Sequence, residues 1–202
     1  MGGVTPPGFR LYPGRLDAER QRALCAEVMA GAQAAPFYRP MTRGGPMSVE
    51  MTNFGPLGWV TDAAGYRYAA AHPITGKPWP AIPGALLELW ADIADRRAPP
   101  DACLVNLYRE GARMGLHQDR DEADFSFPVL SVSLGDTAVF RIGGQTRAGR
   151  TAQVRLASGD VCVLAGEARM AFHGVDRILA GSSPLVPGGG RLNLTLRRAA
   201  PI

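Results

Sequence analysis

The spacing of apolar residues predicts two helices in the first half of the chain. Behind Asp17, a typical N-cap residue, apolar side chains recur at helical spacing: Leu24, Val28 and Met29. This helix should end near residue 34, before a proline. A second helix is expected over residues 84–97, where apolar residues follow the i, i+3, i+4, i+7 rule: Leu86, Leu89, Trp90 and Ile93. Its apolar stripe favours a helix that lies across a sheet.

From residue 101 onward the pattern changes to short strands punctuated by Gly and Asp. Eight segments have strand character: residues 103–108, 116–118, 129–134, 138–142, 152–156, 160–164, 169–172 and 191–197. Many short strands without an intervening helix are typical of a jelly roll. The predicted fold class is therefore α+β, with N-terminal helices packed on a jelly-roll core, or double-stranded β-helix, over residues 101–198.

Two further segments are rich in Gly and Pro. Residues 1–16 are expected to form an N-terminal arm, and residues 17–202 a single domain. Residues 36–83 carry Gly, Pro, Tyr and Trp without a regular period, which is typical of a structured surface segment with a function.

Composition excludes several classes of protein. Hydrophobic residues make up 46% of the chain and charged residues 20%, which argues against intrinsic disorder. No apolar run reaches the roughly 20 residues that a membrane helix needs, and the N-terminus lacks a signal pattern, so we expect a cytoplasmic protein with no membrane partner. The net charge of +4 permits a nucleic-acid partner without arguing for one. The cysteines, each in an apolar stretch, are expected to be buried reduced thiols: Cys25, Cys103 and Cys162.

The histidines offer a candidate metal site. His117 and Asp119 form an HxD motif, and residues i and i+2 of a strand point to the same face. Two histidines and a carboxylate are the facial triad of non-haem Fe(II) oxygenases. His173, which directly follows a distant predicted strand, is the preferred third ligand, and His72 is the competitor. HxD alone is a weak indication, because an ordinary hydrogen-bonded imidazole gives the same pattern.

The last predicted strand adds a second polar pattern. One face of RLNLTLR is entirely polar: Arg191, Asn193, Thr195 and Arg197. If this face points to solvent, it is an ordinary strand face. If it points inward, two guanidiniums and an amide form a site for a small dianion, since arginine pairs bidentately with carboxylates. Asn106 and Tyr108 alternate in a similar way in the strand over 103–108.

Together these pieces resemble the AlkB family of Fe(II)- and 2-oxoglutarate-dependent dioxygenases. The matching stretches lie in order from about residue 36 to 198: MSVEMTNFGPLGWV, GYRY, GKPWPAIP, PDACLVNLY, GARMGLHQDRDE, PVLSVSLGD, FHG and RLNLTLR. The resemblance implies a DNA-repair demethylase that uses Fe(II), 2-oxoglutarate and O2. Its implied substrates are N1-methyladenine and N3-methylcytosine in DNA, preferably single-stranded, with RNA as a further substrate, and its by-product is formaldehyde. We expect a monomer.

The resemblance also implies roles for single residues. Three would ligate Fe(II): His117, Asp119 and His173. Five would hold 2-oxoglutarate, with Arg191 on the distal carboxylate and Arg197, also counted as catalytic, near the metal: Asn106, Tyr108, Arg191, Asn193 and Arg197. Four would contact the nucleic acid: Trp59, Tyr66, Asp121 and Arg147.

The implied nucleotide site is a lid formed by residues 36–83. Trp59 would stack on one face of a flipped base and the His117 ring on the other. Asp121 would accept a hydrogen bond from the exocyclic amine, while Tyr66 and Arg147 would contact the backbone or the rim of the base. The cationic methylated base would be favoured by an acidic patch: Asp119, Asp121 and Glu122.

Several alternatives remain open at this level. Trp59 could be a core aromatic, and Trp79 is more typical of packing than of a base platform. The arginines of the strand region form either a solvated basic face or a phosphate track: Arg141, Arg147, Arg150 and Arg155. The chain could act mainly on RNA or on another methylated substrate, or be an inactive nucleic-acid-binding jelly roll. Two departures from the family pattern are Leu164, in place of a bulky Trp, and a shortened Arg43–Met47 segment.

Overall fold

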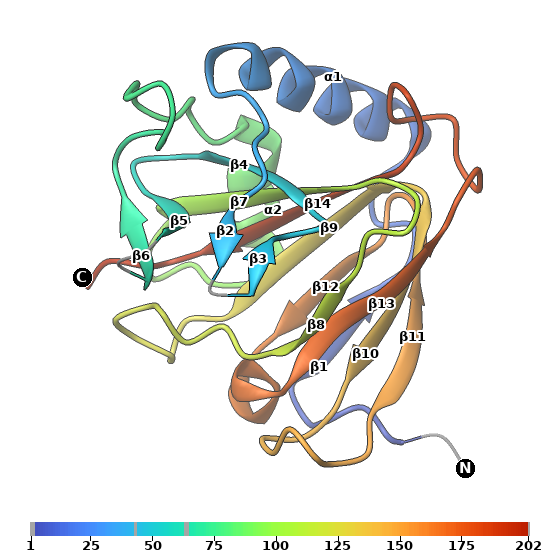
Figure 1. Cartoon of the computed structure of the whole chain (residues 1–202). Coiled ribbons are helices and arrows are strands. Elements are labelled where there is room, and N and C mark those ends of the chain that lie inside the picture. Colours follow the sequence, from blue (N-terminus) through green and yellow to red (C-terminus); the bar gives the residue numbers. More distant parts are fainter. Residues whose placement is uncertain (1–2, 43, 63–64, 202) are drawn as a thin grey trace.

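The computed structural model describes residues 3–42, 44–62 and 65–201. Residues 1–2 of the expected arm and Arg43 of the shortened segment lie outside this part. Two β-sheets face each other, and the two α-helices cover the outer face of the larger one (Figure 1). The predicted α+β jelly roll is confirmed.

The larger sheet has six strands in the order β1-β12-β9-β14-β7-β4. Their bounds are Phe9–Tyr12 for β1, Val161–Leu164 for β12, Val129–Gly135 for β9, Arg191–Arg197 for β14, Ala102–Tyr108 for β7 and Glu50–Phe54 for β4. Each neighbouring pair is antiparallel. The predicted polar strand, β14, lies near the middle of this sheet, and its leucines face the helices: Leu192, Leu194 and Leu196.

The smaller sheet has four strands in the order β11-β10-β13-β8. They are β11 (Ala152–Leu156), β10 (Thr137–Ile142), β13 (His173–Leu179) and β8 (Met114–His117). Apolar side chains from the facing surfaces of the two sheets form a second core, among them Phe140, Val175 and Leu164.

The helices follow the predicted apolar stripes. Helix α1 (Ala18–Ala34) starts at Asp17, whose side chain accepts a hydrogen bond from the Arg20 amide at 2.8 Å. Helix α2 (Gly84–Ile93) ends four residues before the predicted boundary. Just beyond this end, the Asp95 carboxylate accepts a hydrogen bond from the Arg97 amide at 2.7 Å. Such a local side-chain bond to the backbone competes with continuation of the helix. Both helices pack their apolar faces against the outer face of the larger sheet and form one hydrophobic core with it.

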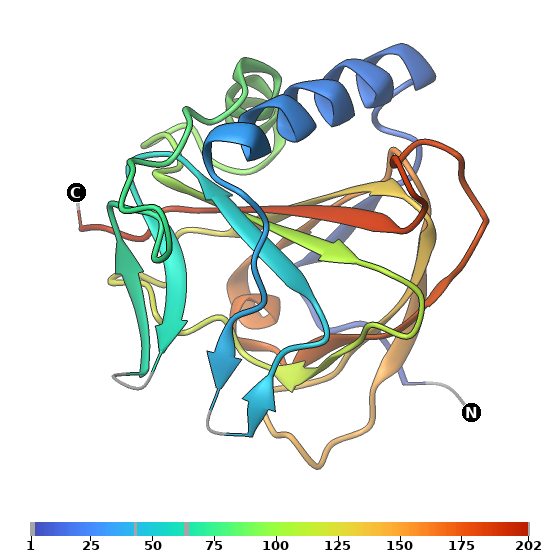
Figure 2. The ribbon, with the colours of Figure 1, turned by 45° about the horizontal axis from the view of Figure 1, so that its top comes forward.

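The segment over residues 36–83 is more regular than the sequence suggested. Strand β4 pairs with β7 and extends the larger sheet, so part of the expected lid belongs to the core. The remainder includes two short hairpins, β2 (Met41–Thr42) with β3 (Gly45–Pro46), and β5 (Gly58–Asp62) with β6 (Gly65–Ala69). They project side by side from one end of the sheets (Figure 2). Part of the expected arm, β1, pairs with β12 at the sheet edge.

The strand predicted over residues 169–172 is wrong. A 3-10 helix, η1 (Gly166–Met170), occupies this region, and β13 begins only at His173. The cause is Arg169, whose buried guanidinium binds partners from the chain between β8 and β9 and so cannot take a place in a strand ladder.

Three smaller expectations can be compared with the structure. The cysteines are buried and free, as predicted: Cys25, Cys103 and Cys162. Trp79 packs in a small core with Ala35 and Val60, which fits its reading as a packing residue. In the described part of the chain, no helix is long and apolar enough to cross a membrane.

Candidate active site

The smaller sheet brings the two histidines of the predicted triad side by side. His117 ends β8, His173 begins β13, and the two are paired in register. Asp119 follows two residues after His117. The possible ligand atoms of these three residues all lie within 4.8 Å of one another. His72 lies elsewhere, with its Nε2 2.8 Å from the Pro36 carbonyl.

Backbone hydrogen bonds orient both imidazoles of the cluster. Nδ1 of His117 lies 2.9 Å from the Gly115 carbonyl, and Nδ1 of His173 lies 2.9 Å from the Ala171 carbonyl. A carbonyl can only accept, so each Nδ1 carries a proton, and in a neutral imidazole with that tautomer Nε2 has the lone pair that binds a metal. These Nε2 atoms lie 3.7 and 3.8 Å from the Asp119 carboxylate. Two neutral imidazoles and a carboxylate on one side of an ion fit Fe(II).

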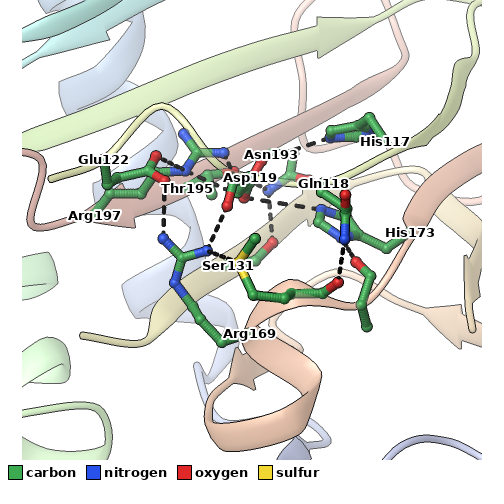
Figure 3. Close-up of polar contacts among 12 residues, drawn as sticks. His117, Gln118, Asp119, Glu122, Ser131, Arg169, His173, Asn193, Thr195 and Arg197 are labelled. Carbon is green, nitrogen blue, oxygen red and sulfur yellow. Dashed lines mark hydrogen bonds and ion pairs between the residues drawn. The ribbon is translucent and has the colours of Figure 1, made fainter. Parts of the chain in front are cut away.

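The charges around the cluster favour this donor set. Burial alone would raise the pKa of Asp119, but nearby Arg197 and the two imidazoles more than offset it, so that pKa is lowered. Burial lowers the pKa of His173 to about 4, so its imidazole is neutral at physiological pH. Arg197 donates to the Asp119 carboxylate at 2.8 Å from Nη2 and 3.2 Å from Nε. Asp119 is thus an ionised, fixed ligand (Figure 3).

A cavity of about 500 Å³ lies between the sheets at this cluster. Most of the residues predicted for the site line it: Trp59, Tyr66, Asn106, Tyr108, His117, Asp119, Asp121, Arg147, His173, Asn193 and Arg197. Leu164 also contributes to the wall. Residues far apart in the sequence therefore meet in one pocket, because the inner faces of β7 and β14 are opposite β8, β10 and β13.

Arg191 lies behind this wall and is fully buried. Its Nη groups donate to Asn193 at 3.1 Å and to Ser133 at 3.0 Å, and its guanidinium carbon lies 5.4 Å from the Tyr108 ring centre. No carboxylate of the described residues pairs with it. Among the described residues, Arg191 Nε and Asn106 Oδ1 are buried without a hydrogen-bond partner. A buried cation with a free donor beside a cavity fits a small carboxylate ligand.

A second buried ion pair was missed by the sequence analysis. Glu122 accepts from Arg169 Nη2 at 2.8 Å, and Arg197 Nε lies 3.4 Å from its other oxygen. The Tyr68 hydroxyl of strand β6 donates to Glu122 at 2.5 Å. Arg169 also donates to the Asp119 backbone carbonyl at 2.6 Å. Through Tyr68, this network joins the β5–β6 hairpin to the metal-ligand cluster and η1. Figure 3 shows the part formed by Asp119, Glu122, Arg169 and Arg197.

The network corrects the expected acidic patch. The charges of Asp119 and Glu122 are balanced by Arg197 and Arg169, so neither is a free anion for a cationic base. Of the three acidic residues, only Asp121 has no arginine partner among the described residues. It accepts the Trp59 indole N–H at 2.7 Å.

The predicted base platform is formed by the β5–β6 hairpin. Trp59 is half-buried, and one face of its ring stacks on Tyr66, with centroids 5.3 Å apart and planes 18° apart. Trp59 and Tyr66 both line the cavity. Arg147, in the loop after β10, places its guanidinium carbon 5.4 Å from the Phe172 ring centre at the same cavity.

A jelly roll with an open His-Asp-His cluster defines a class of enzyme. The chain belongs to the 2OG-Fe(II) oxygenase superfamily, whose family model matches residues 8–197. It is therefore an oxygenase that uses Fe(II), 2-oxoglutarate and O2, as predicted.

Relatives place the chain in the AlkB family within this superfamily. It is 68% identical to the alpha-ketoglutarate-dependent dioxygenase AlkB homolog of Caulobacter vibrioides, over 96% of this chain and 88% of that protein. It is 44% identical to the alpha-ketoglutarate-dependent dioxygenase AlkB of Escherichia coli, over 87% and 83%. The solved structure of OsALKBH1 matches with a TM-score of 0.82 and 32% identity, over 97% of this chain and 99% of that one. The predicted family is confirmed.

Proposed function

We propose that this enzyme demethylates N1-methyladenine and N3-methylcytosine in DNA, preferably single-stranded, and releases formaldehyde. The observation that carries the proposal is the shared cavity, which is lined by the metal-ligand cluster, a half-buried tryptophan and a carboxylate that has no arginine partner among the described residues. RNA is a second substrate class in this proposal, and a cytoplasmic monomer is its expected form.

The cavity suits one extruded base. Its volume of about 500 Å³ lies in the range of small-molecule sites. Trp59 would stack on the base, and His117 would lie on the opposite side. A methyl group on the Watson–Crick edge blocks pairing, so extruding such a base costs less free energy than extruding a normal one. It also gives the ring a positive charge, which Asp121 would favour.

Asp121 can still bind a base while it holds Trp59. One of its oxygens accepts the indole N–H, and a carboxylate has about four lone-pair sites in all. The remaining sites can accept the exocyclic amine of adenine or cytosine. The same hydrogen bond fixes the tryptophan ring, so Asp121 would both orient the platform and bind the base.

The chain's own residues would position both reactants. His117, Asp119 and His173 would hold Fe(II), while Arg191, Asn106 and Tyr108 would bind the distal carboxylate of 2-oxoglutarate, with Asn193 and Arg197 near its other end. Fe(II), 2-oxoglutarate and O2 together supply the hydroxylation of the N-methyl carbon, and the unstable hydroxymethyl product loses formaldehyde. Arg197 would keep Asp119 ionised and oriented through its two hydrogen bonds.

The alternative of an inactive binding module is disfavoured by the complete donor set. All three ligand groups converge, and both imidazoles present the correct nitrogen. An inactive scaffold would have no need to keep Arg191 buried without a carboxylate partner, because an isolated buried cation is costly.

Substrate preference is tested by comparing kcat/KM for four oligomers of one sequence with a central N1-methyladenine. They are single-stranded DNA, duplex DNA, single-stranded RNA and duplex RNA. We expect the highest kcat/KM for single-stranded DNA. A higher value for RNA would overturn the DNA preference, and no formaldehyde from any oligomer would overturn the proposed function.

A further inference from the structure

The outer face of the four-stranded sheet is not covered by α1 or α2, which both pack on the other sheet (Figures 1 and 2). Exposed side chains on this face include Gln153, Arg155 and Arg177. One end of this face lies beside the loop that joins β10 to β11. That loop carries Arg147, which lines the cavity.

Strand register aligns arginines from three neighbouring strands on this face. Val139 of β10 is paired with Arg155 of β11 on one side and with Arg177 of β13 on the other. Side chains of directly paired residues lie on the same face of a sheet. Arg141, two residues after Val139, shares that face and is nearer to the loop. Two further arginines, Arg147 and Arg150, are exposed in the loop itself.

The positive charge of this row is mostly uncompensated. The acid that pairs with it is Asp176, 3.1 Å from Arg177 and 3.9 Å from Arg141. In the described ranges, no ion pair is formed by Arg147, Arg150 or Arg155. The row thus carries five guanidiniums against the single carboxylate that pairs with it, although the whole chain has a net charge of only +4.

We propose that these five residues bind the phosphates of the single DNA strand that carries the extruded base. We name them the arginine track: Arg147, Arg150, Arg141, Arg155 and Arg177. The track begins at the cavity, where Arg147 lies over Phe172, and continues away from it across the sheet. The strand would follow it beyond the nucleotides next to the base.

The chemistry of the track favours a polyanion over a protein partner. Protein interfaces depend on buried aromatic or apolar anchors, whereas Val139, the apolar residue between Arg155 and Arg177, is itself only 5% exposed. Mobile, solvated guanidiniums bind phosphates through charge and counterion release. The assignment to the substrate strand rests on the proposed function, because that function brings a DNA strand to Arg147.

The test is equilibrium binding of unmodified single-stranded DNA, so it needs no turnover. Arg155→Gln/Arg177→Gln removes two charges from the far part of the track. The matched control is Arg20→Gln/Arg22→Gln, which removes two exposed charges from α1 on the other side of the molecule. The Kd is measured for oligomers of about 5 and about 25 nucleotides at salt concentrations between about 50 and 250 mM.

We expect the track variant to weaken binding of the long oligomer and to leave the short one nearly unchanged. Each lost contact should cost on the order of 5-fold at about 0.1 M salt, and losing two should reduce the slope of log Kd against log salt by about 1.4. The control should change both quantities much less. Equal losses in the two variants, or equal losses for the two lengths, would overturn the proposal.

Two further outcomes separate this inference from the proposed function. If the length-dependent loss appears but no methylated oligomer is demethylated, the proposed function and the assignment to a substrate strand fail, while the track still binds single-stranded DNA. If demethylation occurs and the track variant binds long DNA like the wild type, only the track fails. A loss seen with an RNA oligomer of about 25 nucleotides and not with DNA would overturn the assignment to a DNA strand.

Discussion

Glu122 and Arg169 form a buried ion pair, 2.8 Å long, directly beside the metal-ligand cluster. The carboxylate also accepts the Tyr68 hydroxyl from the β5–β6 hairpin, and the guanidinium donates to the backbone of Asp119. One pair of side chains thus links the base platform to a metal ligand. The positions of the β5–β6 hairpin and of Asp119 should therefore both depend on an intact Glu122–Arg169 pair.

Removing one partner of this pair should be strongly destabilising. Arg169→Met leaves the Glu122 charge with one fewer cation, and breaking a buried pair costs about 3–5 kcal/mol of the free energy of unfolding. Glu122→Gln in the same chain should restore part of the loss, since no anion then remains unpaired. Urea unfolding of the wild type, both single variants and the double variant measures the coupling. Additive losses would show that the pair does not act as a unit.

Arg191→Lys should raise the KM for 2-oxoglutarate by about tenfold or more and leave the Kd for DNA nearly unchanged. A lysine ammonium is a point charge and cannot reproduce the guanidinium fork at a carboxylate. The matched control is Arg22→Lys, an exposed position on α1 with no ion pair among the described residues. An unchanged KM in the Arg191 variant would contradict its assignment to the co-substrate.

Trp59→Ala should lower kcat/KM for methylated oligomers by about 5- to 150-fold, which corresponds to a base–aromatic stack of about 1–3 kcal/mol. Decarboxylation of 2-oxoglutarate without a base should persist, because the residues for it lie on the two sheets. A packing tryptophan would instead cost about 3–5 kcal/mol of stability and reduce both activities together. Trp79 is buried, so Trp79→Ala should lose stability and both activities together and serves as the comparison.

Tyr38→Phe should stabilise the protein by about 1 kcal/mol near pH 7, since the Tyr38 hydroxyl is buried without a partner in the described part of the chain. Burial raises the pKa of Tyr38 from 10.0 to about 12. The folded chain then keeps a proton that the unfolded chain loses, so stability falls as the pH rises from 10 towards 12.

The phenylalanine variant should lack this part of the alkaline loss, so its advantage should grow above pH 10. Urea unfolding of both proteins at neutral and alkaline pH measures the difference. A variant less stable than the wild type near neutrality, or a constant difference across the range, would contradict the prediction.

Sequence patterns predicted the site where local spacing encodes geometry. HxD at the end of a strand groups His117 with Asp119, and the period of two in RLNLTLR puts Asn193 on one polar face with two arginines, without knowledge of the fold. That this polar face points inward is shown only by the structure. The third ligand, His173, could only be ranked above His72 from the sequence, because its distance from His117 in space depends on the pairing of β13 with β8.

The elements that the sequence did not predict depend on distant partners. Residues 169–172 have strand character in the sequence, but Arg169 is held by Glu122, 47 residues earlier, and a 3-10 helix forms instead. Strand β4 has no local pattern that distinguishes it from the surrounding loop, and it is defined by pairing with β7. The neutralisation of Asp119 and Glu122 likewise depends on Arg197 and Arg169, which are distant from them in the sequence.

His117, Asp119 and His173 would hold the Fe(II) that, with O2 and 2-oxoglutarate, supplies the oxidation of a methyl group on a base bound in the adjoining cavity. The most direct measurement is the mass of a single-stranded DNA oligomer with one N1-methyladenine, after incubation with protein, Fe(II), 2-oxoglutarate and O2. The wild type should convert it to the unmethylated oligomer with one formaldehyde per base, and Asp119→Ala should leave it unchanged. An unchanged mass with the wild type, or full conversion by Asp119→Ala, would contradict the claim.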